Sequence, residues 1–217
     1  MFAPIMKLTA SDFAALLCAR ICHDLVSPIG ALGAAIEVLD DDDNMDMRED
    51  AMELIKLSAG QASAKLQFLR LAFGAGGAAP GVLGVKELER LSMGVYGEGK
   101  TKLNWQFSVE GIDKPAARIL LNLVMLALQS IPRGGKMSVS VDAVDNAAKM
   151  VFVCTGPKAR LDKKTLMTLA GKAPEDGFDG RTIQPFYTGM ITRDAKGSID
   201  TKIEGETVTF TAIIPNF

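Results

Sequence analysis

Apolar residues recur every three or four positions near the start of the chain, which is the spacing of one face of an α-helix. The stripe consists of Leu17, Ile21, Leu25, Pro28, Leu32, Ala35 and Leu39. Thr9, with Asp12 three residues later, has the form of a helix start. The pattern therefore predicts a helix from about Ala10 to Leu39.

Pro28 lies inside this predicted helix. A proline there removes a backbone hydrogen bond and costs about 3 kcal/mol, so we expect a kink close to it. The alternative is a shorter helix that ends at Pro28. The continuation of the apolar stripe to Leu39 disfavours that alternative.

A second helical stripe follows an acidic loop at Asp40–Asn44. Asp46 and Glu49 suit the first turn of a helix because carboxylates there complement the helix dipole. Gly74 is a natural C-terminal stop. The apolar positions of this second helix are Met47, Ala51, Leu54, Ile55, Ser58, Ala62, Leu66, Leu69 and Phe73.

Two long helices joined by a tight loop form a hairpin, and one hairpin alone cannot cover both apolar stripes. Pairing with the hairpin of a second copy would give a four-helix bundle, so we expect a homodimer. In the alternative arrangement, the stripes pack against the C-terminal part of the same chain.

The pattern changes after Ala75–Gly84, which is rich in glycine and alanine and is typical of a short linker. We expect a helical hairpin over residues 1–75, a linker over 76–84 and a second domain over 85–217. That second domain contains both helical and strand patterns. The predicted helices are Lys86–Gly97, Pro115–Ile131, Asp162–Leu169 and Gln184–Lys196. The predicted strands are Leu103–Val109, Met137–Val144, Lys149–Cys154, Ser198–Ile203 and Thr207–Ile214. The fold class is therefore α+β, with a C-terminal α/β sandwich.

The composition is that of an ordinary soluble globular protein. Of 217 residues, 48% are hydrophobic and 23% charged, and the net charge of −2 gives no basic footprint for nucleic acid. No apolar run reaches the roughly 18 residues of a membrane span, and Ile119–Ile131 is too short. The N-terminus lacks the pattern of a signal peptide. Three cysteines, an odd number, favour a reducing compartment, so we expect a cytoplasmic protein without a membrane partner.

His23 is the only histidine in the chain. On a helical wheel it lies about 150° from the centre of the apolar stripe, so it should face solvent. An exposed imidazole is mostly neutral at pH 7, and its unprotonated nitrogen can attack phosphorus. One alternative is an ordinary surface histidine. Another is a metal site with Cys18 and Cys22, which the lack of a second ligand pair at zinc spacing disfavours.

The neighbours of His23 on the helix surface are small or polar. Ala19, Gly30 and Ala34 would let the backbone of another protein approach, or would serve only in ordinary packing. Arg20 lies one turn away and would either offset phosphate charge or be a solvated arginine. Ser27 would contact a phosphoryl group or simply accommodate the proline that follows it.

Several motifs resemble those of bacterial sensor histidine kinases across nearly the whole chain. His23, followed by Asp24 and by Pro28, is similar to the histidine box of that family. Asn122 lies in a segment that resembles the asparagine box, and Val151–Lys158 resembles the first glycine box. The resemblance implies a dimerisation and phosphotransfer hairpin followed by an ATPase domain of the Bergerat fold.

This chain departs from these boxes at positions that bind the nucleotide in the kinases. Leu126 stands where the kinases carry a second asparagine that holds Mg²⁺, and a leucine cannot coordinate a hard cation. Cys154 stands where they carry an aspartate that accepts from adenine, and a thiol is a poor substitute. Lys158 replaces a glycine, and the later glycine-rich box is reduced to Gly177–Gly180. We expect a retained fold with a degenerate, non-functional ATP site, and neither a cofactor nor a metal bound by this chain.

This combination resembles the ChpT-type histidine phosphotransferases. The resemblance implies transfer of a phosphoryl group from the receiver domain of a hybrid kinase, CckA, through His23 to response regulators such as CtrA and CpdR in cell-cycle control. The receiver would supply Mg²⁺, and Asp24 would orient the imidazole. Two other interpretations compete with it: an active kinase with unusual boxes, and a non-catalytic dimeric adaptor.

Overall fold

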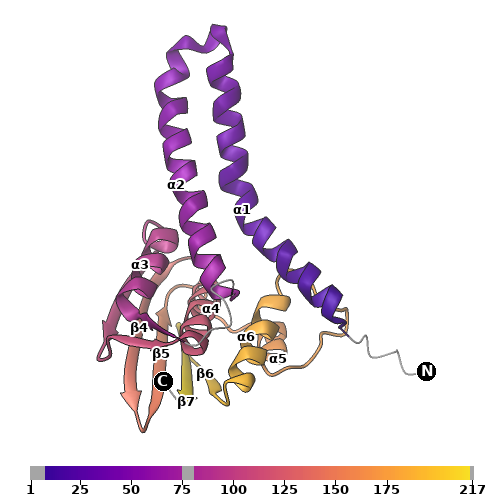
Figure 1. Ribbon diagram of the computed structural model, residues 1–217, viewed down its shortest axis with the longest axis vertical. Coiled ribbons are helices and arrows are strands. Elements are labelled where there is room, and N and C mark those ends of the chain that lie inside the picture. The colour runs from indigo at the N-terminus through magenta and orange to yellow at the C-terminus, as the bar shows by residue number, and fades with distance from the viewer. Residues whose placement is uncertain (1–7, 75–80, 216–217) are drawn as a thin grey trace, which may run out of the picture.

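The chain forms a long helical hairpin that stands on an α/β sandwich (Figure 1). The computed structural model describes residues 8–74 and 81–215. The hairpin consists of α1 (Ala10–Asp40), a short 3₁₀ helix η1 (Asp42–Met47) and α2 (Arg48–Ala72). The acidic stretch that was expected to be a loop therefore contains a helical turn.

Local chemistry fixes both ends of the hairpin as the sequence predicts. The Thr9 hydroxyl accepts the backbone N–H of Asp12 at 3.1 Å and begins α1. Gly74 follows the C-cap of α2 with φ of +89°, a conformation that glycine adopts without strain. The predicted helix start and the predicted stop are both confirmed.

The C-terminal part is built on one five-stranded sheet with the order β2–β4–β5–β7–β6. Its neighbours pair antiparallel except for β2 and β4, which are parallel. Asp145 and Asn146 turn the β4–β5 hairpin with positive φ, as a tight turn requires. The elements are β1 (Val82–Gly84), α3 (Val85–Tyr96), β2 (Thr101–Phe107), β3 (Gly111–Asp113), α4 (Lys114–Ser130), β4 (Gly135–Val144), β5 (Ala147–Thr155), α5 (Lys163–Leu169), α6 (Ile183–Asp194), β6 (Ser198–Glu204) and β7 (Thr207–Pro215).

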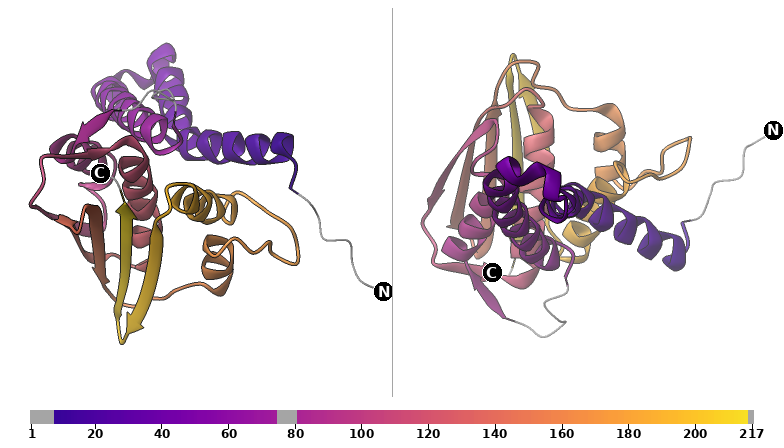
Figure 2. Two further views of the ribbon diagram at one scale, coloured as in Figure 1. Left: turned by 60° about the horizontal axis from the view of Figure 1, so that its bottom comes forward. Right: turned by 90° about the horizontal axis from the view of Figure 1, so that it is seen from above.

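The helices α3, α4 and α6 contact the sheet, and the hairpin rests across this helical layer (Figure 2). In β4, Met137, Val139 and Val141 are buried while the residues between them are not, which is the pattern of a sheet with one covered face. Helix α4 is buried on almost every side because it lies between the sheet and α2. This position explains why its sequence is apolar nearly all round.

The base of the hairpin belongs to the same core as the sandwich. Phe68 and Leu69 of α2 are buried there, and the Phe68 ring meets the Tyr96 ring edge-on at 5.6 Å. The Asn122 side chain of α4 donates to the backbone oxygen of Ala72 at 2.7 Å. The alternative in which the hairpin packs on its own chain is therefore correct for its lower part.

The expected linker over residues 76–84 needs correction. Val82–Gly84 form β1, which pairs antiparallel with β3, and so belong to the sandwich. Gly111 in β3 allows this pairing, because a Cβ there would come within 2.6 Å of the Val82 side chain. Of the other predicted linker residues, 76–80 lie outside the described part of the chain.

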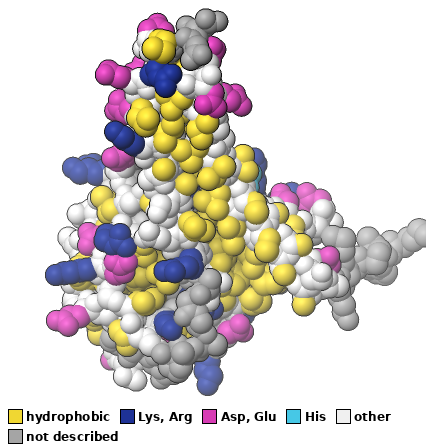
Figure 3. Space-filling view, turned by 45° about the horizontal axis from the view of Figure 1, so that its top comes forward, with side chains coloured by type: hydrophobic (Ala, Val, Ile, Leu, Met, Phe, Trp, Pro, Cys, Tyr) yellow, Lys and Arg dark blue, Asp and Glu magenta, His cyan; other side chains and the backbone are white. Residues whose placement is uncertain are grey.

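The upper hairpin presents a continuous band of apolar side chains to solvent (Figure 3). Its exposed large residues are Val26, Ile29, Ile36, Met45, Met47, Met52, Leu54, Leu57 and Leu66. By length and composition alone, α1 would be able to cross a membrane. The sequence expectation concerned an uninterrupted apolar run, whereas α1 meets this criterion as a helix that also contains Arg20, His23 and Asp24. Only Pro28 and Ala35 of α1 are buried in a single chain.

Candidate functional site

The His23 imidazole projects from α1 into solvent, with 84% of the side chain exposed. The predicted exposure is confirmed. Its Nδ1 lies 3.4 Å from Oδ1 of Asp24, whose own side chain is only 21% exposed. Helical geometry alone does not place adjacent residues on one face. The carboxylate nevertheless reaches the ring, which gives the imidazole one anchored side and one open side.

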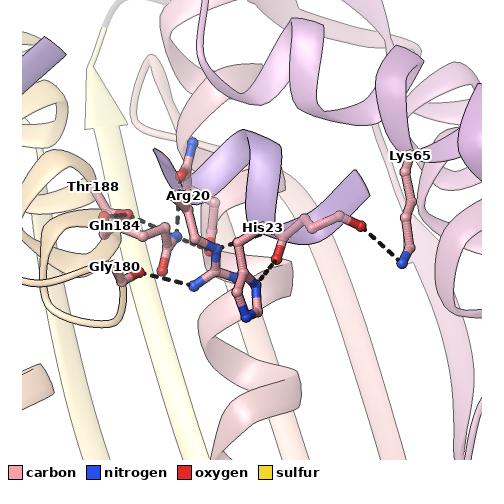
Figure 4. A network of polar contacts seen from close by, with 8 residues as sticks. Arg20, His23, Lys65, Gly180, Gln184 and Thr188 are labelled. Carbon is pink, nitrogen blue, oxygen red and sulfur yellow. Dashed lines mark hydrogen bonds and ion pairs between the residues drawn. The ribbon is translucent and has the colours of Figure 1, made fainter. Parts of the chain in front are cut away.

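Arg20 holds this carboxylate from the preceding turn. Its Nε donates to Asp24 Oδ2 at 3.0 Å, and its Nη1 donates to the backbone oxygen of Gly180 at 3.3 Å (Figure 4). The Arg20 side chain is only 16% exposed, so the interpretation as a solvated arginine is wrong. Each carboxylate oxygen of Asp24 thus has its own neighbour, one a guanidinium and the other an imidazole.

Pro28 changes the backbone hydrogen bonding of the same turn of α1. Because proline has no N–H, the backbone oxygen of Asp24 four residues earlier loses its helical donor. The Lys65 ammonium of α2 donates to that oxygen at 3.1 Å (Figure 4). Helix α1 continues through Pro28 and bends along its length (Figure 1), as the sequence predicts.

Replacing Lys65 by methionine should lower the free energy of unfolding by about 1–2 kcal/mol, because the part-buried carbonyl oxygen of Asp24 would lose its donor. Methionine keeps most of the length and apolar volume of the lysine stem. Lys56→Met is the matched control, since Lys56 is an exposed residue of the same helix. Chemical denaturation of both variants measures the difference, and an equal effect at the two positions would contradict this role for Lys65.

The other predicted site residues lie on the same side of α1 as His23. Ala19, Ser27, Gly30 and Ala34 are all exposed. A Cβ added at Gly30 would meet no atom within 4 Å, so the surface there is open. These residues form a shallow surface of small side chains next to the imidazole, as the sequence predicts.

A cleft of about 580 Å³ begins beside His23 and runs into the sandwich. Arg20 and His23 line it from α1, and Leu126 and Ser130 line it from α4. Other lining residues come from α5 and the segment before it, from the segment before α6 and from β7, and they include Arg160, Leu161, Asp162, Lys164, Thr165, Asp179, Arg181, Thr182 and Phe210. The cleft joins the phosphoacceptor candidate to the C-terminal domain.

Leu126 and Cys154, at which the chain departs from the nucleotide-binding boxes of the kinases, have different surroundings. Leu126 is 2% exposed and adds an apolar surface to the cleft. Cys154 is fully buried in the sheet opposite Met137, and this burial raises the pKa of its thiol to about 12. The thiol is therefore neutral, whereas a carboxylate at that position would be an anionic acceptor.

Sequence reasoning missed two contributors to the site, Lys65 and Gly180. Both act over a large distance in the sequence, Lys65 on the backbone of α1 and Gly180 through its carbonyl oxygen. Pro28 could have indicated the contact of Lys65, because a proline within a helix leaves a carbonyl oxygen without its helical donor. It does not indicate which donor supplies the bond.

Comparison with known proteins agrees with this geometry. Residues 85–207 match the model of the family described as the histidine phosphotransferase C-terminal domain. Over 207 residues the chain is 35% identical to Protein phosphotransferase ChpT of Brucella abortus (strain 2308), which covers 95% of this chain and 98% of that protein. The chain belongs to the histidine phosphotransferase family. It is a protein phosphotransferase of the ChpT type.

The fold of this phosphotransferase matches solved structures. A bacterial phosphotransferase superimposes with a TM-score of 0.84 at 35% identity, over 95% of this chain and 98% of that chain. The histidine kinase AdeS of Acinetobacter baumannii has a TM-score of 0.50 at 14% identity, over 89% of this chain and 98% of that chain. At that identity the likeness shows the fold alone. The expected kinase-like α+β fold of the phosphotransferase is confirmed.

Proposed function

We propose that His23 takes a phosphoryl group from the aspartyl phosphate of one receiver domain and passes it to the aspartate of another. The observation that supports this proposal most strongly is the exposed imidazole with Asp24 against its Nδ1. An ionised carboxylate only accepts hydrogen bonds, so this contact favours a proton on Nδ1 and leaves the Nε2 lone pair as the nucleophile.

In the first step, Nε2 of His23 attacks phosphorus in line with the P–O bond to the aspartyl oxygen. A P–N bond forms, the P–O bond breaks, and the receiver aspartate leaves as a carboxylate. Asp24 stabilises the positive charge that develops on the ring. In the second step, the carboxylate of another receiver attacks the phosphohistidine, and the neutral imidazole is restored as the leaving group.

We propose that the donors and acceptors are the receiver domains of a CckA-like hybrid kinase and of CtrA-like or CpdR-like response regulators of the cell cycle. The 35% identity to a ChpT protein over 95% of this chain supports this assignment. The exposed small residues Ala19, Gly30 and Ala34 would admit the receiver, with Ser27 at the edge of the contact. Mg²⁺ would come with the receiver.

We also propose that this phosphoryl transfer does not use ATP. Leu126 places an apolar side chain where a metal ligand would be needed, and Cys154 is a buried neutral thiol. A nucleotide with its magnesium ion would find neither an oxygen ligand at the first position nor an anionic acceptor at the second. We therefore propose that the phosphoryl group enters only from another protein.

We also propose that the protein is a cytoplasmic homodimer. Nine large apolar residues of the upper hairpin are at least 40% exposed in a single chain, and a contiguous apolar surface of this kind marks an interaction site. A second hairpin would cover it with apolar side chains of the same kind and complete a four-helix bundle. Arg20 and Asp24 lie within α1, and such charged residues favour this arrangement over a membrane.

Incubation with a receiver domain that carries a labelled phosphoryl group, in the presence of Mg²⁺, tests the function. Label should move to this chain, be lost in mild acid as a phosphohistidine would lose it, and move on to a second receiver. The same incubation with labelled ATP should leave the chain unlabelled. Labelling by ATP would favour the kinase interpretation. Failure of transfer from several receivers would contradict the relay and favour the adaptor.

A further inference from the structure

Arg20 connects the helix that carries His23 to the C-terminal domain through a single side chain. Its Nε binds Asp24 within α1, while its Nη1 binds the backbone oxygen of Gly180 from across the cleft. The guanidinium is planar and offers its donors in a fixed fork. Both contacts therefore constrain one rigid group, and a shift of the Gly180 oxygen alters how the guanidinium meets Asp24.

The loop that presents the Gly180 oxygen is itself closely held. Asp179 accepts the backbone N–H groups of Arg181 at 2.9 Å and Thr182 at 2.8 Å, and the Thr182 hydroxyl at 2.7 Å. The Thr182 hydroxyl accepts the backbone N–H of Asp179 in return. These bonds, above all that from Thr182, lower the pKa of Asp179, so the carboxylate stays ionised at neutral pH. Gly180 is the residue enclosed by this ring of bonds.

We infer that Arg20 is a positioning residue that holds Asp24 against His23 Nδ1, and that loop 179–182 sets how firmly it does so. The inference rests on the proposed function, since it assigns the control of the same imidazole. It also assigns a role to the C-terminal domain: through Arg20, this domain favours the tautomer of His23 in which Nε2 is free to attack.

The alternative role for Arg20 is direct neutralisation of the transferred phosphoryl group. The structure disfavours it, because Nε and Nη1 of Arg20 are both engaged and the side chain is 16% exposed, against 84% for His23. A residue that contacts the phosphoryl group would change how tightly a phosphorylated receiver binds. A positioning residue would change the state of the ring before any receiver arrives.

The single histidine makes this state directly measurable. In a nitrogen-15 NMR spectrum of the tag-free full chain, the only imidazole signals are those of His23. When the ring carries a single proton, these signals report the ratio of the Nδ1–H to the Nε2–H tautomer. We expect the Nδ1–H tautomer to predominate in the wild type, because it alone can donate to Asp24.

Arg20→Ala should lower this tautomer ratio by about threefold, since one modest hydrogen bond would lose its support. Arg20→Lys keeps a charge but cannot bridge both partners, so it should shift the ratio in the same direction by less. Thr182→Val removes no charge and loosens the loop, and it should shift the ratio as well. Thr192→Val is the matched control, because it removes a buried hydroxyl that bonds within α6.

An unchanged tautomer ratio in both Arg20 variants would overturn the inference. A shift in the Arg20 variants without a shift in Thr182→Val, or an equal shift in Thr192→Val, would overturn the role of the loop. In receiver transfer, Arg20→Ala should lower kcat while KM for the receiver stays the same, and a change in KM alone would overturn the positioning role. The spectrum needs no receiver, so it separates this inference from failure of the proposed function.

Discussion

Replacing His23 by alanine should reduce phosphoryl transfer to background, a loss of at least about a thousandfold, because the covalent nucleophile is removed. The fold should be unaffected. The side chain is 84% exposed, and such surface substitutions usually change the free energy of unfolding by less than about 0.5 kcal/mol. Measurement of label transfer from a phosphorylated receiver, together with a thermal melt of each variant, separates the two effects.

Glu37→Ala provides the control for this experiment, since Glu37 is an exposed residue of the same helix. It should transfer label as well as the wild type does. Residual transfer in His23→Ala would mean that another side chain carries the phosphoryl group. With no other histidine in the chain, the labelled residue would then differ from phosphohistidine in its stability to acid or to alkali.

The second large effect is expected in the oligomeric state. Ile36→Glu should weaken the proposed dimer by about a hundredfold or more, because it would bury a carboxylate without a partner in an apolar bundle. Each substitution counts twice in a two-fold symmetric interface. Light scattering coupled to gel filtration should find a dimer for the wild type at micromolar concentration and a monomer for the variant.

Ile203→Glu is a closely matched control for this prediction. Ile203 lies on β6 in the sandwich and has the same 48% exposure as Ile36 in a single chain. It should leave the dimer intact. A wild type that is monomeric throughout the micromolar range would contradict the homodimer, as would a variant that remains dimeric. In either case something other than a second copy would have to cover the apolar band.

Short-range signals in the sequence predicted the hairpin and the position of its histidine. The stripe of apolar residues fixed the face of α1 that packs inward, and this placed His23 outward by helical geometry alone. Thr9 and Gly74 act on residues next to them, so their effect was predictable without knowledge of the tertiary structure. The alternation of apolar and polar residues likewise predicted strands, and in β4 the apolar positions of this alternation are the buried ones.

The contacts that complete the site join residues far apart in the chain, and no local pattern predicts them. Lys65 meets the backbone of Asp24 from 41 positions away, and Gly180 meets Arg20 from 160. Both depend on how the hairpin sits on the sandwich. The short strand β1 was missed for a similar reason, because its partner β3 lies across α3 and β2 in the sequence.

Because Phe68 and Leu69 are part of the interior of the sandwich, the hairpin is not an independent folding unit. A fragment cut after α2 would leave these side chains in water, and the remaining sandwich would lose one wall of its interior. If this hairpin were fused to an unrelated domain, that domain would need an apolar surface of matching shape to cover Phe68 and Leu69. Signalling specificity in such proteins would therefore evolve more readily by surface substitutions around His23 than by exchange of whole modules.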